Sequence, residues 1–224
     1  TMERAQELCV SLLCDRESAC LTVYNPLSWE WTRQITVVDT GAVPVGYTWQ
    51  RYTALDGSGK LAIGGVSIPS LAGTSVPMTQ TTTEAADAPV PFALDGDTLE
   101  TPFARVRFTA TGEIVSFVDK TADRELVADS TKPLNTFYMG EDIPTLWDNW
   151  DVDADMDLRY KDCSKFLSSQ MVSRGAVELR IRNRYQISEK STITQDMIFY
   201  ADSPLVKFET MMDWQEEHRF LKTA

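Results

Sequence analysis

The stretch FARVRFTATGEIVSFVDK, residues 103–120, gives the clearest indication of secondary structure in the chain. Its residues alternate, so that Ala104 and Val106 fall on one face of an extended strand and the neighbouring arginines on the other. After the turn signal TATGE the same period of two resumes and places Ile114 and Phe117 on opposite faces. The pattern predicts a β-hairpin with one face on a hydrophobic core.

Similar segments occur on both sides of this hairpin. Those before it are CLTVY (20–24), RQITVV (33–38), GYTWQRYT (46–53) and GKLAIGGVSIP (59–69), and those after it are AVELRIRNRYQI (176–187), STITQDMIFY (191–200) and PLVKFETMMDW (204–214). Within the Pro-, Thr-, Ala- and Asp-rich residues 69–97, the part TQTTTEAADAP predicts a loop or an edge strand. Because turns separate the strands, and not helical patterns of about 10–15 residues, we expect antiparallel sheets. The predicted fold class is therefore mainly β, a large antiparallel β-sandwich.

The first residues carry a different pattern. Leu8, Leu12 and their apolar neighbours recur at helical spacing, and Thr1 fits an N-cap. We expect a short N-terminal helix within residues 1–16. Because Thr1 precedes Met2, and because a short helix needs a surface to cover, we interpret it as the end of a helical region in a longer protein.

Composition excludes several classes of function. The 224 residues carry a formal charge of −12 and a pI near 4.5, so the protein repels polyanions, and we expect neither nucleic acid nor an anionic membrane surface as a partner. No apolar run approaches the roughly 20 residues that span a bilayer. The four cysteines form neither a zinc ligand set nor a disulfide framework, which fits a reducing compartment.

The stretch LWDNWDVDADMD, residues 146–157, concentrates tryptophan and aspartate. Trp147, Asp148, Trp150 and Asp151 are candidates for contact with a sugar, because aromatic faces stack on sugar rings and carboxylates bind hydroxyls. Two tryptophans three positions apart in a strand or loop point in different directions, so one could lie on a sugar while the other packs. The alternative is that both tryptophans only anchor an ordered acidic loop.

Two further interpretations of this stretch are weaker. Asp151, Asp153 and Asp155 match the first ligand positions of an EF-hand, but Met156 replaces the required glycine and Asp162 replaces the bidentate glutamate. A glycosidase needs two carboxylates at a defined separation, and the acidic residues near this stretch qualify by residue type alone. The single histidine, His218, has no nucleophile motif beside it, and we expect a structural, hydrogen-bonded role for it.

Four phrases, in order, resemble one family, the α-mannosidases of glycoside hydrolase family 38, in the portion that follows the catalytic barrel. They are LTVYNPLSWEWTRQITV (21–37), ARVRFTATGEIVSFVDKTADREL (104–126), EDIPTLWDNWDVD (141–153) and SPLVKFETMMDWQEEHRFLK (203–222). The third is most similar to the cytosolic and bacterial branch. In the last, Phe220 stands where the family pattern has leucine.

The resemblance implies a retaining enzyme that hydrolyses terminal α-linked mannose, with an aspartate nucleophile and a zinc ion in a barrel domain. This chain has one histidine and no H-x-D pair. We therefore expect no catalytic residue, no metal ligand and no cofactor within it, and zinc in the catalytic domain of the parent enzyme. The implied domains are the end of a helical bundle (1–16), a small β-domain (17–88) and the beginning of a large sandwich of the galactose-mutarotase-like type (89–224).

The resemblance also gives the tryptophan–aspartate stretch a role. We expect Trp147, Asp148, Trp150 and Asp151 to face the barrel, where they wall the substrate pocket or, as the preferred interpretation, seal the domain interface. The expected partners are the chain's own catalytic barrel and a carbohydrate substrate, and the expected location is cytoplasmic. The alternatives are a stand-alone carbohydrate-binding β-sandwich module and a purely structural domain of another enzyme.

Overall fold

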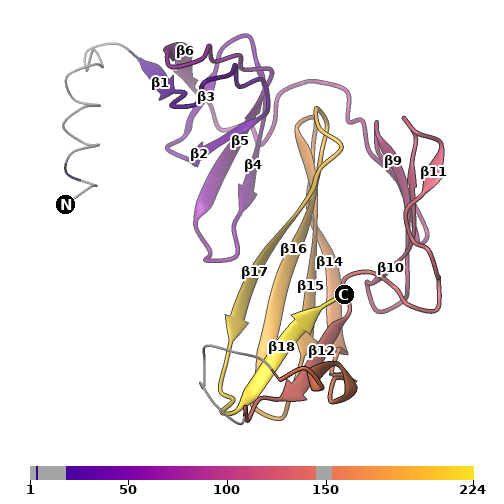
Figure 1. The fold of residues 1–224 in the computed structure, drawn as a ribbon. Helices are drawn as coiled ribbons and strands as arrows, with labels where there is room; N and C mark the ends of the chain where they lie inside the picture. The colour runs from indigo at the N-terminus through magenta and orange to yellow at the C-terminus, as the bar shows by residue number, and fades with distance from the viewer. Residues whose placement is uncertain (1–3, 5–18, 145–152) are drawn as a thin grey trace.

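The computed structural model describes Arg4, residues 19–144 and residues 153–224. These residues form antiparallel β-sheets and one short 3-10 helix, η1 (Met156–Leu158), as Figure 1 shows. The mainly-β antiparallel fold predicted from the sequence is confirmed. Within the described ranges no helix is long and apolar enough to cross a membrane. The helix predicted within residues 1–16 lies outside the described residues, except for Arg4.

The first strands build a unit that we call the small sandwich. It consists of one sheet in the order β1 (Cys20–Tyr24), β6 (Gly73–Gln80) and β3 (Ala42–Pro44), and another in the order β2 (Ile35–Val38), β5 (Gly59–Gly64) and β4 (Thr48–Thr53). Buried side chains from both sheets, among them Val43, Trp49, Leu61, Ile63 and Val76, form its core. Four strands predicted before the hairpin are therefore confirmed.

Strand β6 was not expected from its Pro- and Thr-rich segment. It is the middle strand of its sheet, and Val76 is fully buried in the core. Pro77 is tolerated there because it lies one residue beyond the part of β6 that pairs with β3, so the ladder does not need its missing N–H. Its carbonyl still accepts the Val45 N–H at 2.9 Å. The tertiary position of this segment thus overrides its loop-like composition.

The hairpin predicted at 103–120 is confirmed as β9 (Ala104–Phe108) and β10 (Ile114–Asp119). It belongs to a five-stranded sheet in the order β11 (Arg124–Glu125), β10, β9, β8 (Thr98–Glu100) and β7 (Ala93–Asp95). One detail of the prediction is wrong. The register shifts between Ile114 and Ser116, which is a β-bulge, and so Ile114 and Phe117 both pack on one core where strict alternation would separate them.

Four long strands form the centre of the molecule. Their order is β14 (Lys165–Arg174), β15 (Glu178–Gln186), β16 (Thr192–Tyr200) and β17 (Val206–Asp213), and we call them the central sheet. The last three are confirmed predictions. The edge strand β14 was not predicted, since most of its side chains are exposed and its polar run shows no alternation. A further sheet has the order β13 (Lys161–Asp162), β12 (Phe137–Glu141) and β18 (Arg219–Thr223).

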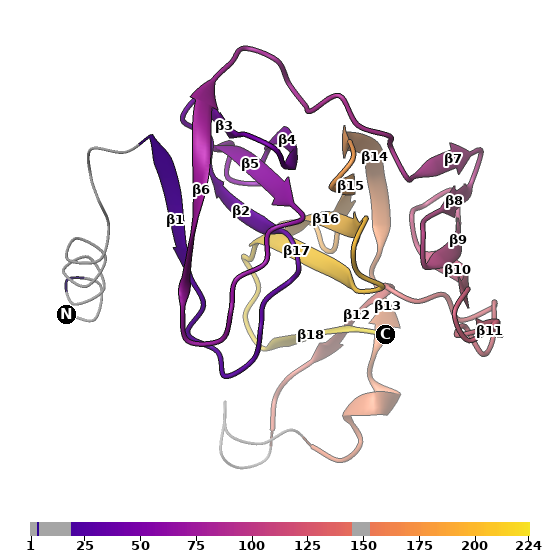
Figure 2. The ribbon, with the colours of Figure 1, turned by 90° about the horizontal axis from the view of Figure 1, so that it is seen from above.

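The central sheet is covered on both faces. On one face, Leu179 and Met197 pack with Val106 of the hairpin, and Tyr185 packs with Phe137 of β12. On the other face lies the small sandwich, and Figure 2 shows it across the central sheet from β7–β11. The central sheet is therefore the middle layer, and the face toward the small sandwich is the one that carries charge.

Candidate functional site

The residues predicted to form a site, Trp147, Asp148, Trp150 and Asp151, lie outside the described residues. Their role stays a prediction. The structure does describe both flanks of the segment. The chain enters it after β12 and leaves it at Asp153, shortly before η1 and β13.

On the downstream flank, an arginine side chain forms ion pairs with two aspartates of the EF-hand-like pattern. Arg159 Nη2 donates to Asp155 Oδ1 and Oδ2 at 2.9 and 2.7 Å and lies 3.8 Å from Asp153 Oδ2. Met156, which stands where an EF-hand needs glycine, is 4% exposed. Both aspartates are therefore already paired with a cationic side chain of the protein, as in an ordinary ion-paired turn.

On the upstream flank, His218 holds the end of β12. It adopts a left-handed backbone conformation (φ 53°) just before β18, and its carbonyl accepts the Asp142 N–H at 2.8 Å. Its side chain is exposed. The observed contact is thus a structural one made by the main chain.

The most elaborate polar arrangement lies on the charged face of the central sheet. Glu178, Arg180 and Arg182 project from one face of β15 because they are two residues apart. In the ladder, Asp196 of β16 stands opposite Arg182, and Glu209 of β17 stands opposite Asp196. Glu178, Arg180 and Asp196 are 0%, 2% and 0% exposed, so these charges are buried.

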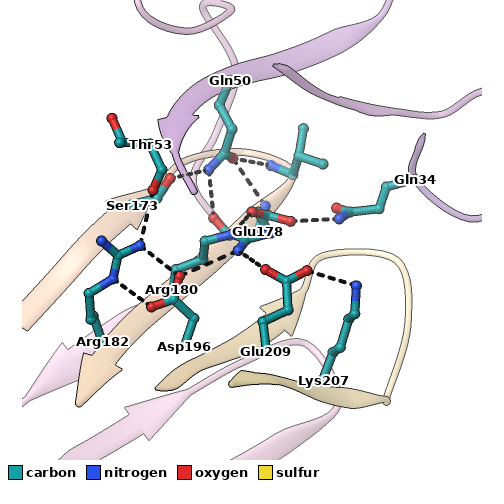
Figure 3. A network of polar contacts seen from close by, with 11 residues as sticks. Gln34, Gln50, Thr53, Ser173, Glu178, Arg180, Arg182, Asp196, Lys207 and Glu209 are labelled. Carbon is teal, nitrogen blue, oxygen red and sulfur yellow. Dashed lines mark hydrogen bonds and ion pairs between the residues drawn. The ribbon is translucent and has the colours of Figure 1, made fainter. Parts of the chain in front are cut away.

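The side chains of this row pair with one another, as Figure 3 shows. Arg182 Nε and Nη2 donate to the two oxygens of Asp196 at 2.7 and 2.9 Å. Arg180 Nε donates to Glu178, and Arg180 Nη1 donates to Glu209 Oε2 at 2.8 Å. We call this row, together with Lys207, which binds Glu209 Oε1 at 2.7 Å, the charge network.

Gln50 of β4 ties the small sandwich to the start of β15. Its Oε1 accepts the N–H groups of Val177 and Glu178 at 2.9 and 3.0 Å, and its Nε2 donates to the Glu178 carbonyl and to Ser173 Oγ at 2.9 and 2.7 Å. Gly175 allows this approach, because a Cβ there would lie 2.3 Å from Gln50 Oε1. One buried carboxamide thus replaces a backbone partner for the turn between β14 and β15.

Three more contacts reach the charge network from the small sandwich. The guanidinium carbon of Arg180 lies 3.8 Å from the centroid of the Tyr52 ring, in cation–π geometry. Gln34 Nε2 donates to Glu178 Oε2 at 2.6 Å, and Arg182 Nη2 donates to the carbonyl of Thr53 at 3.1 Å. Every one of these contacts joins a residue of the first 53 to one beyond 177.

Burial and pairing set the pKa values of the network in opposite directions. Burial alone would lower the pKa of Arg180, but the Glu178 and Glu209 carboxylates outweigh it and raise that pKa. Burial also opposes ionisation of Glu209, yet Lys207 and Arg180 hold its pKa below the ordinary value. Burial raises the pKa of Tyr52 to about 12, which keeps the phenol neutral. The raised pKa of Arg180 and the lowered pKa of Glu209 keep this pair charged throughout the neutral range.

Each carboxylate of this arrangement is engaged by an arginine side chain. Within residues 19–144 and 153–224, no group of three or more His, Cys, Asp and Glu side chains is placed to hold a metal ion. The network can orient two sheets, because each of its bonds is directional.

The central sheet and its neighbours match a known protein family. A model of the glycosyl hydrolases family 38 C-terminal domain matches residues 99–224, which is more than half of the chain. The chain belongs to glycosyl hydrolase family 38. The family 38 match runs from the second residue of β8 through β18, and so it includes the hairpin, the central sheet and the carboxylates and arginines of the charge network.

Known family members of similar sequence carry the name of an enzyme. Human and mouse Alpha-mannosidase 2C1 are 30% and 31% identical to this chain over 126 residues, which is 56% of the chain and 12% of each relative. Alpha-mannosidase G of Dictyostelium discoideum is 24% identical over 133 residues, 57% of the chain and 12% of the relative. The aligned part of the chain thus spans only 12% of the length of these relatives.

The contacts between the charge network and the small sandwich cross the border of the family 38 match. Glu178, Arg180 and Asp196 lie inside it, whereas Gln34 and Gln50 precede residue 99. The sequence pattern of AVELRIRNRYQI (176–187) predicted a strand but did not predict that another unit would bury its charged face. The available signal was charge balance, since acidic residues stand at matching positions of the next two strands.

Proposed function

We propose that this chain is a non-catalytic β-domain segment of an α-mannosidase that hydrolyses terminal α-linked mannose. The observation that carries the proposal is the match of residues 99–224 to the family 38 C-terminal domain. The names of the human, mouse and Dictyostelium relatives support the substrate class. In this proposal the chain supports the catalytic barrel, while the nucleophile, the acid–base residue and the zinc ion belong to the barrel.

We assign three parts to the segment. Residues 1–16 end a helical bundle, residues 17–88 form a small β-domain, and residues 89–224 begin the large sandwich. The separate cores of the small sandwich and of the central sheet support a border between the last two parts. Cys20 and Cys163 are free thiols, and this supports a cytoplasmic location for the parent protein.

We propose that Trp147, Asp148, Trp150 and Asp151 face the barrel and seal the interface with it. The flank of this segment supports the idea. Asp142 Oδ1 is buried and has no hydrogen-bond partner among the described residues, so this edge retains an acceptor for a group from elsewhere.

The central claim is tested by activity. The purified chain should not hydrolyse 4-nitrophenyl α-mannoside, with or without added zinc, whereas the full-length protein that contains it should do so. Zinc-dependent turnover by the chain alone would contradict the non-catalytic role. Failure of the full-length protein to cleave any α-mannoside would contradict the enzyme assignment.

The interface role is tested by substitution in the full-length protein. Trp150→Ala should lower the temperature at which activity is lost and leave KM unchanged, because a sealing residue does not touch substrate. Trp29→Ala, at a tryptophan that is 60% exposed in the small sandwich, is the matched control. A rise in KM with unchanged thermal stability would indicate instead that Trp150 lines the substrate pocket.

A further inference from the structure

The two edges of the central sheet are built differently. β14 and β17 are its outermost strands, and among the described residues each is paired on one side only (Figure 1). An open edge offers unpaired N–H and C=O groups to any extended chain, and proteins protect such edges with bulges, charges or short strands. A comparison of the two strands therefore shows which edge is protected against pairing.

The edge strand β14 carries this protection. Its register with β15 shifts twice, between residues 166 and 168 and between residues 171 and 173, so two irregularities interrupt the strand. Lys165 begins the strand and is exposed. A broken, polar edge of this kind is a poor template for a further regular strand.

The opposite edge strand, β17, lacks the same protection. Its eight residues pair with β16 in an unbroken register and include no proline. Its one lysine, Lys207, is held by Glu209 at 2.7 Å. Phe208, Met211 and Met212 are 41%, 45% and 42% exposed, although large apolar side chains gain most from burial. β17 is thus a long, regular and apolar edge.

An apolar trough of about 510 Å³ lies along this strand. Its lining includes Phe208 and Met212 of β17, Leu221 of β18, Phe117 of β10, and Leu126. Phe208 and Met212 project to the same side of β17 because they are an even number of positions apart. A strand added at this edge would present every second side chain to that side, and apolar residues there would cover the trough.

The other side of an added strand would meet different chemistry. Lys207, Glu209 and Asp213 project to that side of β17, together with Met211. Charged residues favour polar or oppositely charged neighbours across a ladder. The edge therefore fits a strand of alternating apolar and polar residues that pairs through its main chain, which is the chemistry of β-augmentation.

We propose that β17 pairs with a further β-strand of the same polypeptide, from outside residues 1–224, whose apolar side chains cover the trough. This inference rests on the proposal that the chain is a segment of a longer enzyme. The relatives support a strand in cis, since the aligned part is only 12% of their length. A tethered segment also reaches a far higher effective concentration than a separate partner does.

The first test is hydrogen exchange of the full-length protein, read by mass spectrometry. The outward N–H groups of β17 should exchange at least about tenfold more slowly than those of β14, because only β17 gains a second ladder. Outward groups of β17 that exchange as fast as those of β14 would overturn the proposal. The measurement needs no substrate, so its outcome is separate from whether the protein cleaves an α-mannoside.

Two matched variants test the covered side chains. Met212 and Met171 lie on opposite edges of the same sheet and are 42% and 43% exposed. In the full-length protein, Met212→Lys should speed the exchange of β17 about tenfold and lower the unfolding temperature by several degrees, because it places a charge under the added strand. Met171→Lys should leave both quantities unchanged. Equal shifts in the two variants would contradict the proposal.

A cross-link identifies the occupant and does not require Met212→Lys to fold. The variant Phe208→p-benzoylphenylalanine of the full-length protein should form, on irradiation, a link to a peptide of the same molecule outside residues 1–224. A link to a second copy or to another protein, a link confined to residues 1–224, or no link at all would each overturn the proposal.

Discussion

The two faces of the central sheet are buried by different means. On the face toward the hairpin, Leu179, Ile181 and Met197 pack with apolar side chains, and the contact is non-directional. On the face toward the small sandwich, Arg180 and Asp196 are equally buried but act through hydrogen bonds and ion pairs with fixed geometry. Both faces belong to the same strands, so the difference arises from what covers each one.

The two kinds of burial contribute differently to the stability of the fold and to the precise placement of the covering layer. Apolar burial stabilises in rough proportion to area, about 25 cal/mol per Å², and tolerates small shifts of the covering layer. A buried ion pair contributes little net stability compared with an apolar replacement, but a misplaced partner leaves an uncompensated charge. We therefore infer that the hairpin face supplies most of the stability, while the charge network fixes how the small sandwich sits.

The largest effect should follow the loss of Arg180. Arg180→Met retains the apolar stem but leaves Glu178 and Glu209 without their cation, and we expect it to lower the free energy of unfolding by about 3–5 kcal/mol. The measurement is urea unfolding of the purified chain. Arg105→Met removes an arginine from the solvent-screened pair with Glu100, where the loss should be much smaller. Equal losses in the two variants would show that the buried charge network is no more sensitive to the loss of its arginine than an exposed ion pair is.

A core substitution on the opposite face should cost somewhat less. Leu179→Ala should lower the free energy of unfolding by about 2–5 kcal/mol through lost burial and a cavity. It should leave the small sandwich in place, because no contact of the charge network is lost. Limited proteolysis of the loop around residues 81–90 reports the placement, and faster cleavage in Leu179→Ala than in Arg180→Met would reverse our division of roles.

Loss of the Gln50 carboxamide should have an intermediate effect. Gln50→Ala leaves the N–H groups of Val177 and Glu178 unpaired in a buried position, and we expect a loss of about 1–3 kcal/mol. Gln50→Glu tests the direction of the bonds, since a carboxylate accepts from both N–H groups but cannot donate to Ser173. A Gln50→Ala variant as stable as the wild type in urea would show that water replaces the amide.

The smallest effect concerns pH. Because the folded-state pKa of Glu209 is lowered, its contribution is present above the ordinary value of 4.5 and is lost as pH falls through the folded pKa. Glu209→Gln should therefore reduce stability by about 1 kcal/mol at pH 7 and make the acid decline shallower. Urea unfolding at several pH values between 7 and 3.5 measures this. Glu217→Gln, outside the network, controls for the change in net charge. If the loss of stability at low pH is the same in Glu209→Gln as in the wild type, other carboxylates cause that loss.

The sequence predicted local structure well where one strand faces one core. The period of two in residues 103–120 was sufficient for the hairpin, but the bulge that joins Ile114 and Phe117 on one face depends on pairing with β9. Strand β6 could not be predicted from composition, because its burial comes from neighbours on both sides. The burial of Glu178 likewise depends on Gln34 and Gln50, more than 120 residues away in sequence. The domain borders and the role of Trp147, Asp148, Trp150 and Asp151 stay predictions.

The charge network lies inside the family 38 match, but the residues that cover it precede the match, and this has a practical consequence for anyone who expresses this region of the protein. A recombinant fragment cut at residue 99 would keep Glu178, Arg180 and Asp196 but lose Gln50, Tyr52 and Gln34, which cover them. Its central sheet would present a water-facing row of alternating charges beside an uncovered Val177. Cloning boundaries should therefore be placed upstream of residue 20, where the small sandwich begins, and not at the start of the family match.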